Sequence, residues 1–149
     1  MSESTEVQRR ARQDIADVLV RYASGIDGRQ WELFRSCFTD DCDADYGDVG
    51  AWKGADEITT FMREMHEPLG PTLHRITNQT VEFRGDDQAA ARSYVDALVM
   101  GPDDGPAIRV AGYYDDELER VVDDWKIKRR RFTMVHLEMG TEGTNPAVQ

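Results

Sequence analysis

The stretch IADVLVRYASGIDGRQWELFRSCFTDD, residues 15–41, decides how this chain of 149 residues folds. Apolar side chains recur in it at intervals of three and four residues, which is the spacing of one helix face. The pattern predicts a long amphipathic helix over residues 5–27, and Gly28 stands where a glycine commonly ends a helix. A second, short helix is predicted over RQWELFRSCF, residues 29–38.

Shorter elements follow this stretch. CDADY, residues 42–46, is compatible with a short strand, and GAWKG, residues 50–54, is typical of a turn or hairpin. Apolar residues return at helical spacing over Ala55–His66 and predict a third helix there. Pro68 and the pair Gly70–Pro71 mark its end.

The second half of the chain changes to strand patterns. Four long strand candidates are joined by turn-rich links, namely residues 74–83, 88–100, 106–121 and 124–137. His74 and Ile76 share one alternation phase and Val81 and Phe83 the other, so we predict a β-bulge between them. Helices followed by an antiparallel meander predict an α+β fold. A curved sheet wrapped around the first helix would form a cone whose open mouth is a pocket.

Composition limits the possible partners. A net charge of −11 disfavours nucleic acid as the main partner, because phosphate binding needs a basic surface. The one dense basic run is KIKRRR, residues 126–131, which is best explained as a strand with Lys126, Lys128 and Arg130 in solvent. A nucleic-acid or membrane patch there is the weaker alternative.

Neither a membrane segment nor a secretion signal is indicated. No apolar run is long enough to cross a bilayer, and the polar N-terminus has no secretory signal pattern. We therefore expect a cytoplasmic protein that does not bind membranes. We also expect a single domain over residues 1–149, with a loose tail from about residue 140.

No cofactor or metal is expected. Cys37 and Cys42 lack the spacing of a metal motif, so we expect two reduced structural thiols. The carboxylates of DDCDADYGD, residues 40–48, do not follow an EF-hand loop. No glycine fingerprint indicates a flavin or nicotinamide site.

Asp27 and His74 are the pair best suited to chemistry. A carboxylate at a helix C-terminus faces the negative end of the helix dipole, and a histidine among apolar residues is partly desolvated. If the two meet, Asp27 can hold the imidazole in one tautomer and leave the other nitrogen free to take a proton. A solvated helix end and a satisfied core histidine are the plain alternatives.

Several stretches resemble the SnoaL-like branch of the nuclear transport factor 2-like superfamily. They are residues 15–41, DADYGDVGAWKGADEI (43–58), TLHRITN (72–78), GYYDDELER (112–120) and WKIKRRRFT (125–133). Within that branch the motifs are similar to those of scytalone dehydratase and hexachlorocyclohexane dehydrochlorinase, which pair an Asp ending the first helix with a His on a long strand. The resemblance implies a cone-shaped α+β barrel and a cofactor-free elimination with His74 as the base.

The resemblance also points to further pocket residues. Tyr46 matches a pocket tyrosine of the dehydratase, and Arg129 lies near a pocket arginine of the dehydrochlorinase. The first helix lacks the lysine of the dehydrochlorinase. The strand ARSYVDA, residues 91–97, lacks the second pocket histidine of the dehydratase, and the remaining histidines, His66 and His136, lie in other elements.

Other candidates follow from their positions. Tyr22 lies on the apolar stripe of the first helix, where it either packs in the core or donates a hydrogen bond to a substrate. Arg129 shares a strand phase with Trp125 and Ile127, so it must be functional or paired with an acid such as Asp96 or Asp116. The candidate pocket walls are Trp52, Phe61, Met65 and Tyr114, which are also compatible with core positions. Asn78 is a further pocket candidate, and satisfying the backbone of the predicted bulge is its preferred alternative.

The sequence favours a lyase of the dehydratase or dehydrohalogenase type. His74, oriented by Asp27, would remove a carbon-bound proton from a small hydrophobic or aromatic substrate, while Tyr22, Tyr46 or Arg129 stabilises the departing group or oxyanion. An isomerase or cyclase using the same base, and a binding module without chemistry, stay open. A homodimer or homotrimer is expected through an exposed sheet face, with candidate residues Leu98, Met100, Val110 and Tyr113.

Overall fold

The structure is a computed structural model that describes residues 2–140. The helices within these residues are α1 (Glu3–Asp27), α2 (Trp31–Arg35) and α3 (Ala55–His66). The strands are β1 (Phe38–Asp45), β2 (Ala51–Lys53), β3 (Thr72–Phe83), β4 (Gln88–Val99), β5 (Ile108–Val121) and β6 (Asp124–Met139), with single 3₁₀ turns at η1 (Gly47–Val49) and η2 (Pro102–Asp104). The predicted tail lies mostly outside the described residues.

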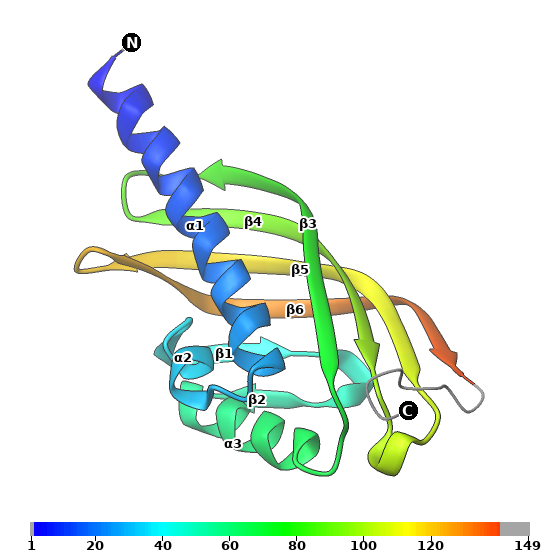
Figure 1. Ribbon diagram of the computed structural model, residues 1–149. Helices are drawn as coiled ribbons and strands as arrows, with labels where there is room; N and C mark the ends of the chain where they lie inside the picture. Colours follow the sequence, from blue (N-terminus) through cyan, green and yellow to red (C-terminus); the bar gives the residue numbers. More distant parts are fainter. Residues whose placement is uncertain (1, 141–149) are drawn as a thin grey trace.

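The strands form one curved mixed sheet in the order β2-β1-β6-β5-β4-β3 (Figure 1). Strands β3 to β6 pair as the antiparallel meander that the sequence predicts, and β1 joins β6 in parallel. Helix α1 crosses one face of the sheet, and α2 and α3 lie beside β1 and β2 (Figure 1). The α+β fold with a long N-terminal helix and a curved sheet is confirmed.

Helix α1 attaches to the sheet through the apolar face that its sequence predicts. Its first turn is capped by Ser2, whose hydroxyl accepts a hydrogen bond from the Thr5 amide. The helix then buries a stripe at helical spacing, made of Ile15, Val18, Leu19, Tyr22 and Ile26. This stripe packs with buried side chains of α2, α3 and the strands β1, β4, β5 and β6 to form the hydrophobic core.

The predicted β-bulge in β3 is confirmed. The register between β3 and β4 shifts between Thr77 and Thr80, and Asn78 has a left-handed φ of 51°. The extra backbone length lets His74 face inward at one end of the strand while Val81 packs against the core at the other. Asn78 itself is exposed at the bulge, so its placement in the pocket is corrected.

The other predicted elements differ from the structure mainly at their ends. The third helix has the predicted bounds, whereas α2 is limited to Trp31–Arg35 because the chain enters β1 already at Phe38. The left-handed residue after α1 is Arg29, with φ 55°, rather than Gly28. No helix of the described residues is long and apolar enough to span a membrane.

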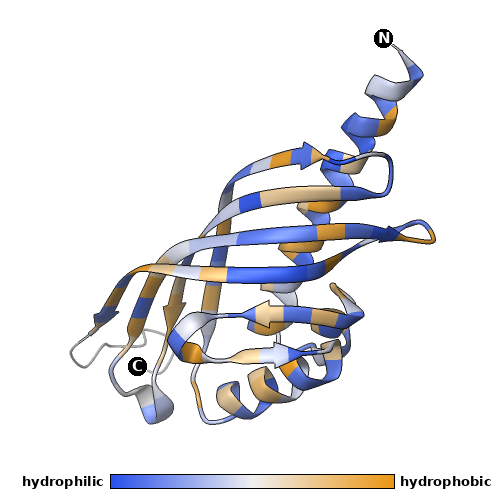
Figure 2. Ribbon diagram, turned by 180° about the vertical axis from the view of Figure 1, so that it is seen from behind, coloured by the Kyte–Doolittle hydropathy of each residue, from blue (hydrophilic) through white to orange (hydrophobic). Residues whose placement is uncertain are grey.

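The outer face of the sheet, which lies opposite α1 and is turned toward the viewer in Figure 2, carries both charged and apolar residues, such as Arg92, Asp96 and Tyr94. Leu98 and Tyr113 belong to this face, where the Arg92 guanidinium lies 4.4 Å from the centre of the Tyr113 ring. Val110, which the sequence analysis grouped with them, instead lines the inner cavity. Val110 is therefore not on the outer face, and a dimer or trimer through that face stays a prediction.

Candidate active site

Asp27 and His74 are in direct contact. Asp27 Oδ1 lies 2.7 Å from His74 Nδ1, and Asp27 Oδ2 accepts the His74 backbone N–H at 2.7 Å. The carboxylate is the last residue of α1 and the histidine is the third residue of β3. Because a carboxylate oxygen can only accept, Nδ1 carries the ring proton and Nε2 is the nitrogen left with a lone pair.

The carboxylate of Asp27 is held in its charged form. Burial alone would raise the pKa of Asp27, but the hydrogen bonds from the His74 ring and backbone, attraction to His74 and the Thr72 hydroxyl outweigh it and lower the pKa. Thr72 Oγ1 donates to Asp27 Oδ1 at 2.8 Å. These three donors, the His74 ring, the His74 backbone and the Thr72 hydroxyl, offset the repulsion between the Asp27 carboxylate and the negative end of the helix dipole.

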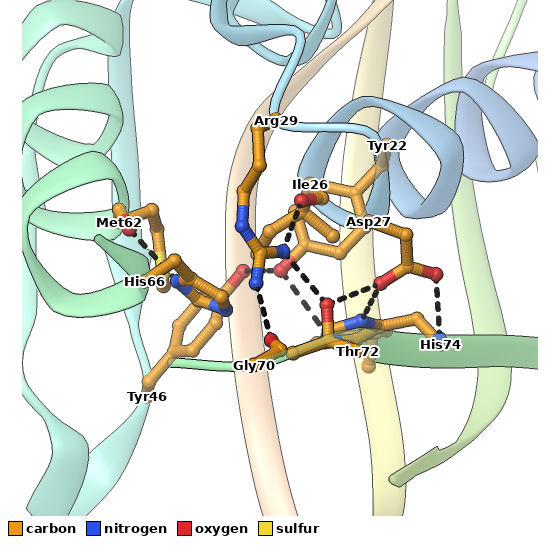
Figure 3. A network of polar contacts seen from close by, with 11 residues as sticks. Tyr22, Ile26, Asp27, Arg29, Tyr46, Met62, His66, Gly70, Thr72 and His74 are labelled. Carbon is orange, nitrogen blue, oxygen red and sulfur yellow. Dashed lines mark hydrogen bonds and ion pairs between the residues drawn. The ribbon is translucent and has the colours of Figure 1, made fainter. Parts of the chain in front are cut away.

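Arg29 completes this network from the turn after α1 (Figure 3). Its Nη1 donates to the Ile26 carbonyl at 2.8 Å and to Thr72 Oγ1 at 2.9 Å, and its Nη2 donates to the Gly70 carbonyl at 2.8 Å. Since Thr72 Oγ1 accepts from Arg29, its single hydrogen is directed to Asp27. Arg29 cannot be recognised as a site residue from the sequence, because its role depends on its left-handed backbone and on its three acceptors.

Three tyrosines form a buried hydroxyl cluster beside the dyad. Tyr22 Oη lies 2.9 Å from Tyr46 Oη, and Tyr114 donates to Tyr22 at 3.5 Å. The rings of Tyr22 and His74 are nearly perpendicular, with centroids 6.5 Å apart. Burial raises the pKa of Tyr22 and Tyr46 well above their ordinary values, so both hydroxyls stay protonated. One of their two hydrogens makes the bond between them, and the other can be donated to a ligand.

The cation next to these tyrosines is Arg130, not Arg129. Arg130 is 1% exposed, makes a bidentate ion pair with Asp116 at 2.7 and 2.9 Å, and lies 3.8 Å from the centre of the Tyr114 ring. Burial lowers the pKa of Arg130, but Asp116 and the tyrosines outweigh it, so the guanidinium stays charged. Its Nη1 has no hydrogen-bond partner among the described residues.

A β-bulge explains this correction. Leu118 pairs with Ile127 and Glu117 pairs with Arg129, which leaves Lys128 as an extra residue in β6. The extra residue reverses the alternation after Ile127, so Arg129 is exposed and Arg130 faces inward. The prediction that Arg129 shares a face with Trp125 and Ile127 is therefore wrong, and so is the prediction that Arg130 lies in solvent.

A cavity of about 130 Å³ lies between the dyad and the tyrosines. Its polar side chains are Tyr22, Tyr46, His66, His74 and Tyr114. Most of the remaining wall is apolar and comes from α1, α3 and the inner face of the sheet, including Ile26, Met62, Leu69, Val95, Ala97 and Phe132. A small apolar space with few polar groups is the usual form of a small-molecule site.

The predicted pocket walls separate into two groups. Met65 and Tyr114 line the cavity as predicted. Trp52 and Phe61 do not line it, because their rings pack on each other with centroids 4.5 Å apart and face a different surface hollow. Aromatic spacing alone could not separate these two positions from the cavity, since both faces of α3 carry large side chains.

His66 is the cavity residue that the sequence analysis left unassigned. It is the last residue of α3 and its ring lies in the cavity wall with His74, although the two residues come from different elements. The chain therefore does place a second histidine at its pocket, from a helix rather than from the strand of residues 91–97.

The two cysteines are buried and free, and burial raises the pKa of each thiol to about 11. Both are therefore neutral thiols near pH 7, as expected for structural positions. Within residues 2–140 no group of three or more His, Cys, Asp or Glu side chains is arranged to hold a metal ion.

Comparison with known proteins identifies the family. The SnoaL-like domain matches residues 7–131. The chain belongs to the SnoaL-like family. Among curated relatives, the uncharacterized protein Rv2910c of Mycobacterium tuberculosis is 28% identical over 120 residues, which cover 80% of this chain and 82% of the relative.

Solved structures share the fold of this SnoaL-like domain. LinA has a TM-score of 0.88 at 23% identity and covers 96% of this chain and 99% of its own. A putative scytalone dehydratase from Novosphingobium aromaticivorans has a TM-score of 0.85 at 21% identity, and the match covers 95% of this chain and 99% of the dehydratase chain. At these identities the likeness establishes the NTF2-like fold.

Proposed function

We propose that this SnoaL-like protein is a cofactor-independent lyase that removes a carbon-bound proton with His74. The observation that carries the proposal is the contact between Asp27 and His74 Nδ1 at the wall of a small apolar cavity. This contact fixes the tautomer in which Nε2 is the proton acceptor. General base catalysis by such a nitrogen contributes about 10²–10⁴ in rate.

The tyrosine cluster supplies the complementary group. Removal of a carbon-bound proton develops negative charge on a neighbouring oxygen or leaving group, and a preorganised donor stabilises it. Tyr22 and Tyr46 stay protonated and line the same cavity as His74. The charged Arg130 lies 4.3 Å from the centre of the Tyr22 ring and adds favourable potential without contacting the cavity itself.

Fold likeness supports the same reaction class. LinA is described as a hexachlorocyclohexane dehydrochlorinase, and another neighbour is described as a putative scytalone dehydratase. Dehydrochlorination and dehydration both break a C–H bond, form a C=C bond and release an anion that leaves as acid or water. A His–Asp dyad next to phenol donors suits both reactions.

The proposal can be tested with single-ring ketones that carry a leaving group. We expect 3-hydroxycyclohexanone or 3-chlorocyclohexanone to yield cyclohexenone, with loss of water or hydrogen chloride, followed by absorbance and mass spectrometry. His74→Ala should lower the rate by at least about 10². His136→Ala is the matched control, because His136 is exposed on β6. A near-wild-type rate in His74→Ala would refute proton abstraction by His74.

The same assay in D₂O separates the alternatives. An isomerase or cyclase would release neither water nor hydrogen chloride, and its product would differ from the substrate in mass only by deuterium gained at the carbon that is reprotonated. A binding module would retain the ring ketone unchanged and free of deuterium. Elimination is the outcome that the adjacent Tyr22 and Tyr46 donors favour, since they can stabilise charge on the ketone oxygen as the leaving group departs.

A further inference from the structure

His66 has no role in the proposed proton abstraction, but its hydrogen bond defines its tautomer. Its Nδ1 lies 2.7 Å from the Met62 carbonyl oxygen, one helical turn earlier in α3 (Figure 3). A carbonyl oxygen can only accept a hydrogen bond, so Nδ1 carries the proton. Nε2 is consequently a lone-pair acceptor, and it has no hydrogen-bond partner among residues 2–140.

The ring of His66 is kept neutral by its surroundings. The side chain is 3% exposed, and burial lowers the pKa of His66, with Arg29 and His74 acting in the same direction. The lining residues around it, Met62, Met65 and Leu69, have no side-chain donor. His66 lines the cavity, so an Nε2 without a protein partner is left to accept a hydrogen bond from a ligand or water there.

The cavity size restricts what can satisfy this acceptor. About 130 Å³ is close to the space of about 150 Å³ that holds one benzene molecule in an engineered apolar cavity. One six-membered ring therefore fills this space, and a longer ligand would extend out through its open side. The wall around such a ring includes both His74 and His66.

We propose that His66 is a specificity-determining residue whose Nε2 accepts a hydrogen bond from a hydroxyl or N–H group on a single-ring ligand. The ligand class is then a small ring with a donor group directed to α3 and a C–H bond directed to β3. This inference rests on the proposed function only in taking the cavity as the binding site. It concerns binding, and its test requires no turnover.

The two histidines thus have different partners. His74 Nδ1 is committed to Asp27, and its Nε2 faces the bond to be broken. His66 Nδ1 is committed to the Met62 backbone, and its Nε2 holds the ligand in place. A ligand that lacks the donor leaves Nε2 without that hydrogen bond, so the site should prefer a ligand that carries the donor.

The first measurement uses the wild-type protein with ¹⁵N-labelled histidine. Its three histidines, His66, His74 and His136, give a spectrum simple enough to assign through single substitutions. We expect His66 to be the Nδ1–H tautomer, and we expect phenol to shift its Nε2 signal much more than toluene does. An Nε2–H tautomer, or equal shifts with both probes, would overturn the inference.

The second measurement compares phenol and toluene affinities in variants, using isothermal titration calorimetry. Wild type should bind phenol about tenfold more tightly than toluene, as one hydrogen bond allows. His66→Leu should remove this preference and His66→Gln, which keeps an acceptor oxygen, should restore part of it. A phenol preference that persists in folded His66→Leu refutes the role of His66 and leaves the proposed lyase function standing. If His66→Leu does not fold, the labelled wild-type spectrum decides the question.

Discussion

Asp27 binds His74 through both carboxylate oxygens: Oδ1 lies 2.7 Å from the ring Nδ1, and Oδ2 accepts the backbone N–H at 2.7 Å. The carboxylate thus fixes the orientation of the strand and of the imidazole together. Asp27→Asn should lower the elimination rate by about 10²–10⁴, because the amide no longer selects the tautomer or stabilises the imidazolium. Asp17→Asn, an exposed position on α1, is the control and should leave the rate unchanged.

Thr72 provides a finer test of the same network. Its hydroxyl donates to Asp27 at 2.8 Å, which helps to lower the pKa of Asp27. Thr72→Val removes that donor, so the pKa of Asp27 should rise toward its ordinary value. NMR titration of the Asp27 side-chain carboxyl measures this directly. An unchanged or lower pKa in the variant would contradict the assigned direction of the hydrogen bond.

Arg29 acts on the dyad through Thr72. Arg29→Met removes the donor that turns the Thr72 hydroxyl toward Asp27, together with the bonds to two backbone carbonyls. We expect about a tenfold loss of kcat with little change in KM, and a raised pKa of Asp27. Arg35→Met, on an exposed ion pair of α2, is the control. A loss confined to KM would assign Arg29 to ligand binding instead.

Breaking the buried pair of Arg130 and Asp116 should cost more stability than breaking an exposed ion pair. Asp116→Asn leaves a fully buried guanidinium without its counter-ion, which costs about 3–5 kcal/mol in the free energy of unfolding. The adjacent Asp115 pairs with Arg92 on the opposite, solvent-exposed face. Asp115→Asn should therefore change stability little. Urea unfolding of both variants measures the contrast, and equal losses would contradict it.

Acidification should destabilise the protein through His66. The folded state lowers the pKa of His66, while the unfolded chain has the ordinary imidazole value of about 6.5. The unfolded state therefore binds more protons below that pH, and the free energy of unfolding should fall as pH drops from 7 toward 5. His66→Gln should show a shallower fall over the same range. An identical pH dependence in both proteins would refute this assignment.

Much of the architecture is predictable because each element carries its own periodic signal. The apolar stripe of α1, the bounds of α3 and the four long strands follow from side-chain spacing. The bulge in β3 is visible as a phase change between Ile76 and Val81. Asp27 and His74 stand out because each is unfavourable in its local element, so a partner elsewhere in the fold is needed.

Other site residues depend on backbone geometry that spacing does not reveal. Uninterrupted alternation along β6 would place Arg129 on the inner face. The extra residue Lys128 reverses the alternation, so that Arg130 lies on the inner face instead. Arg29 depends on a left-handed turn, and His66 depends on where α3 ends against the sheet. These features arise from tertiary packing, which local pattern does not encode.

The bulge at Asn78 divides β3 into two segments in which the alternation of side chains is reversed. Before the bulge, the even-numbered His74 faces the cavity. After the bulge, the odd-numbered Val81 and Phe83 pack against the core, and Arg12 of α1 donates to the Val81 carbonyl. Substitutions on the cavity side therefore need not disturb the scaffold side. The strand can acquire a new ligand preference at one end while its other end keeps the molecule assembled.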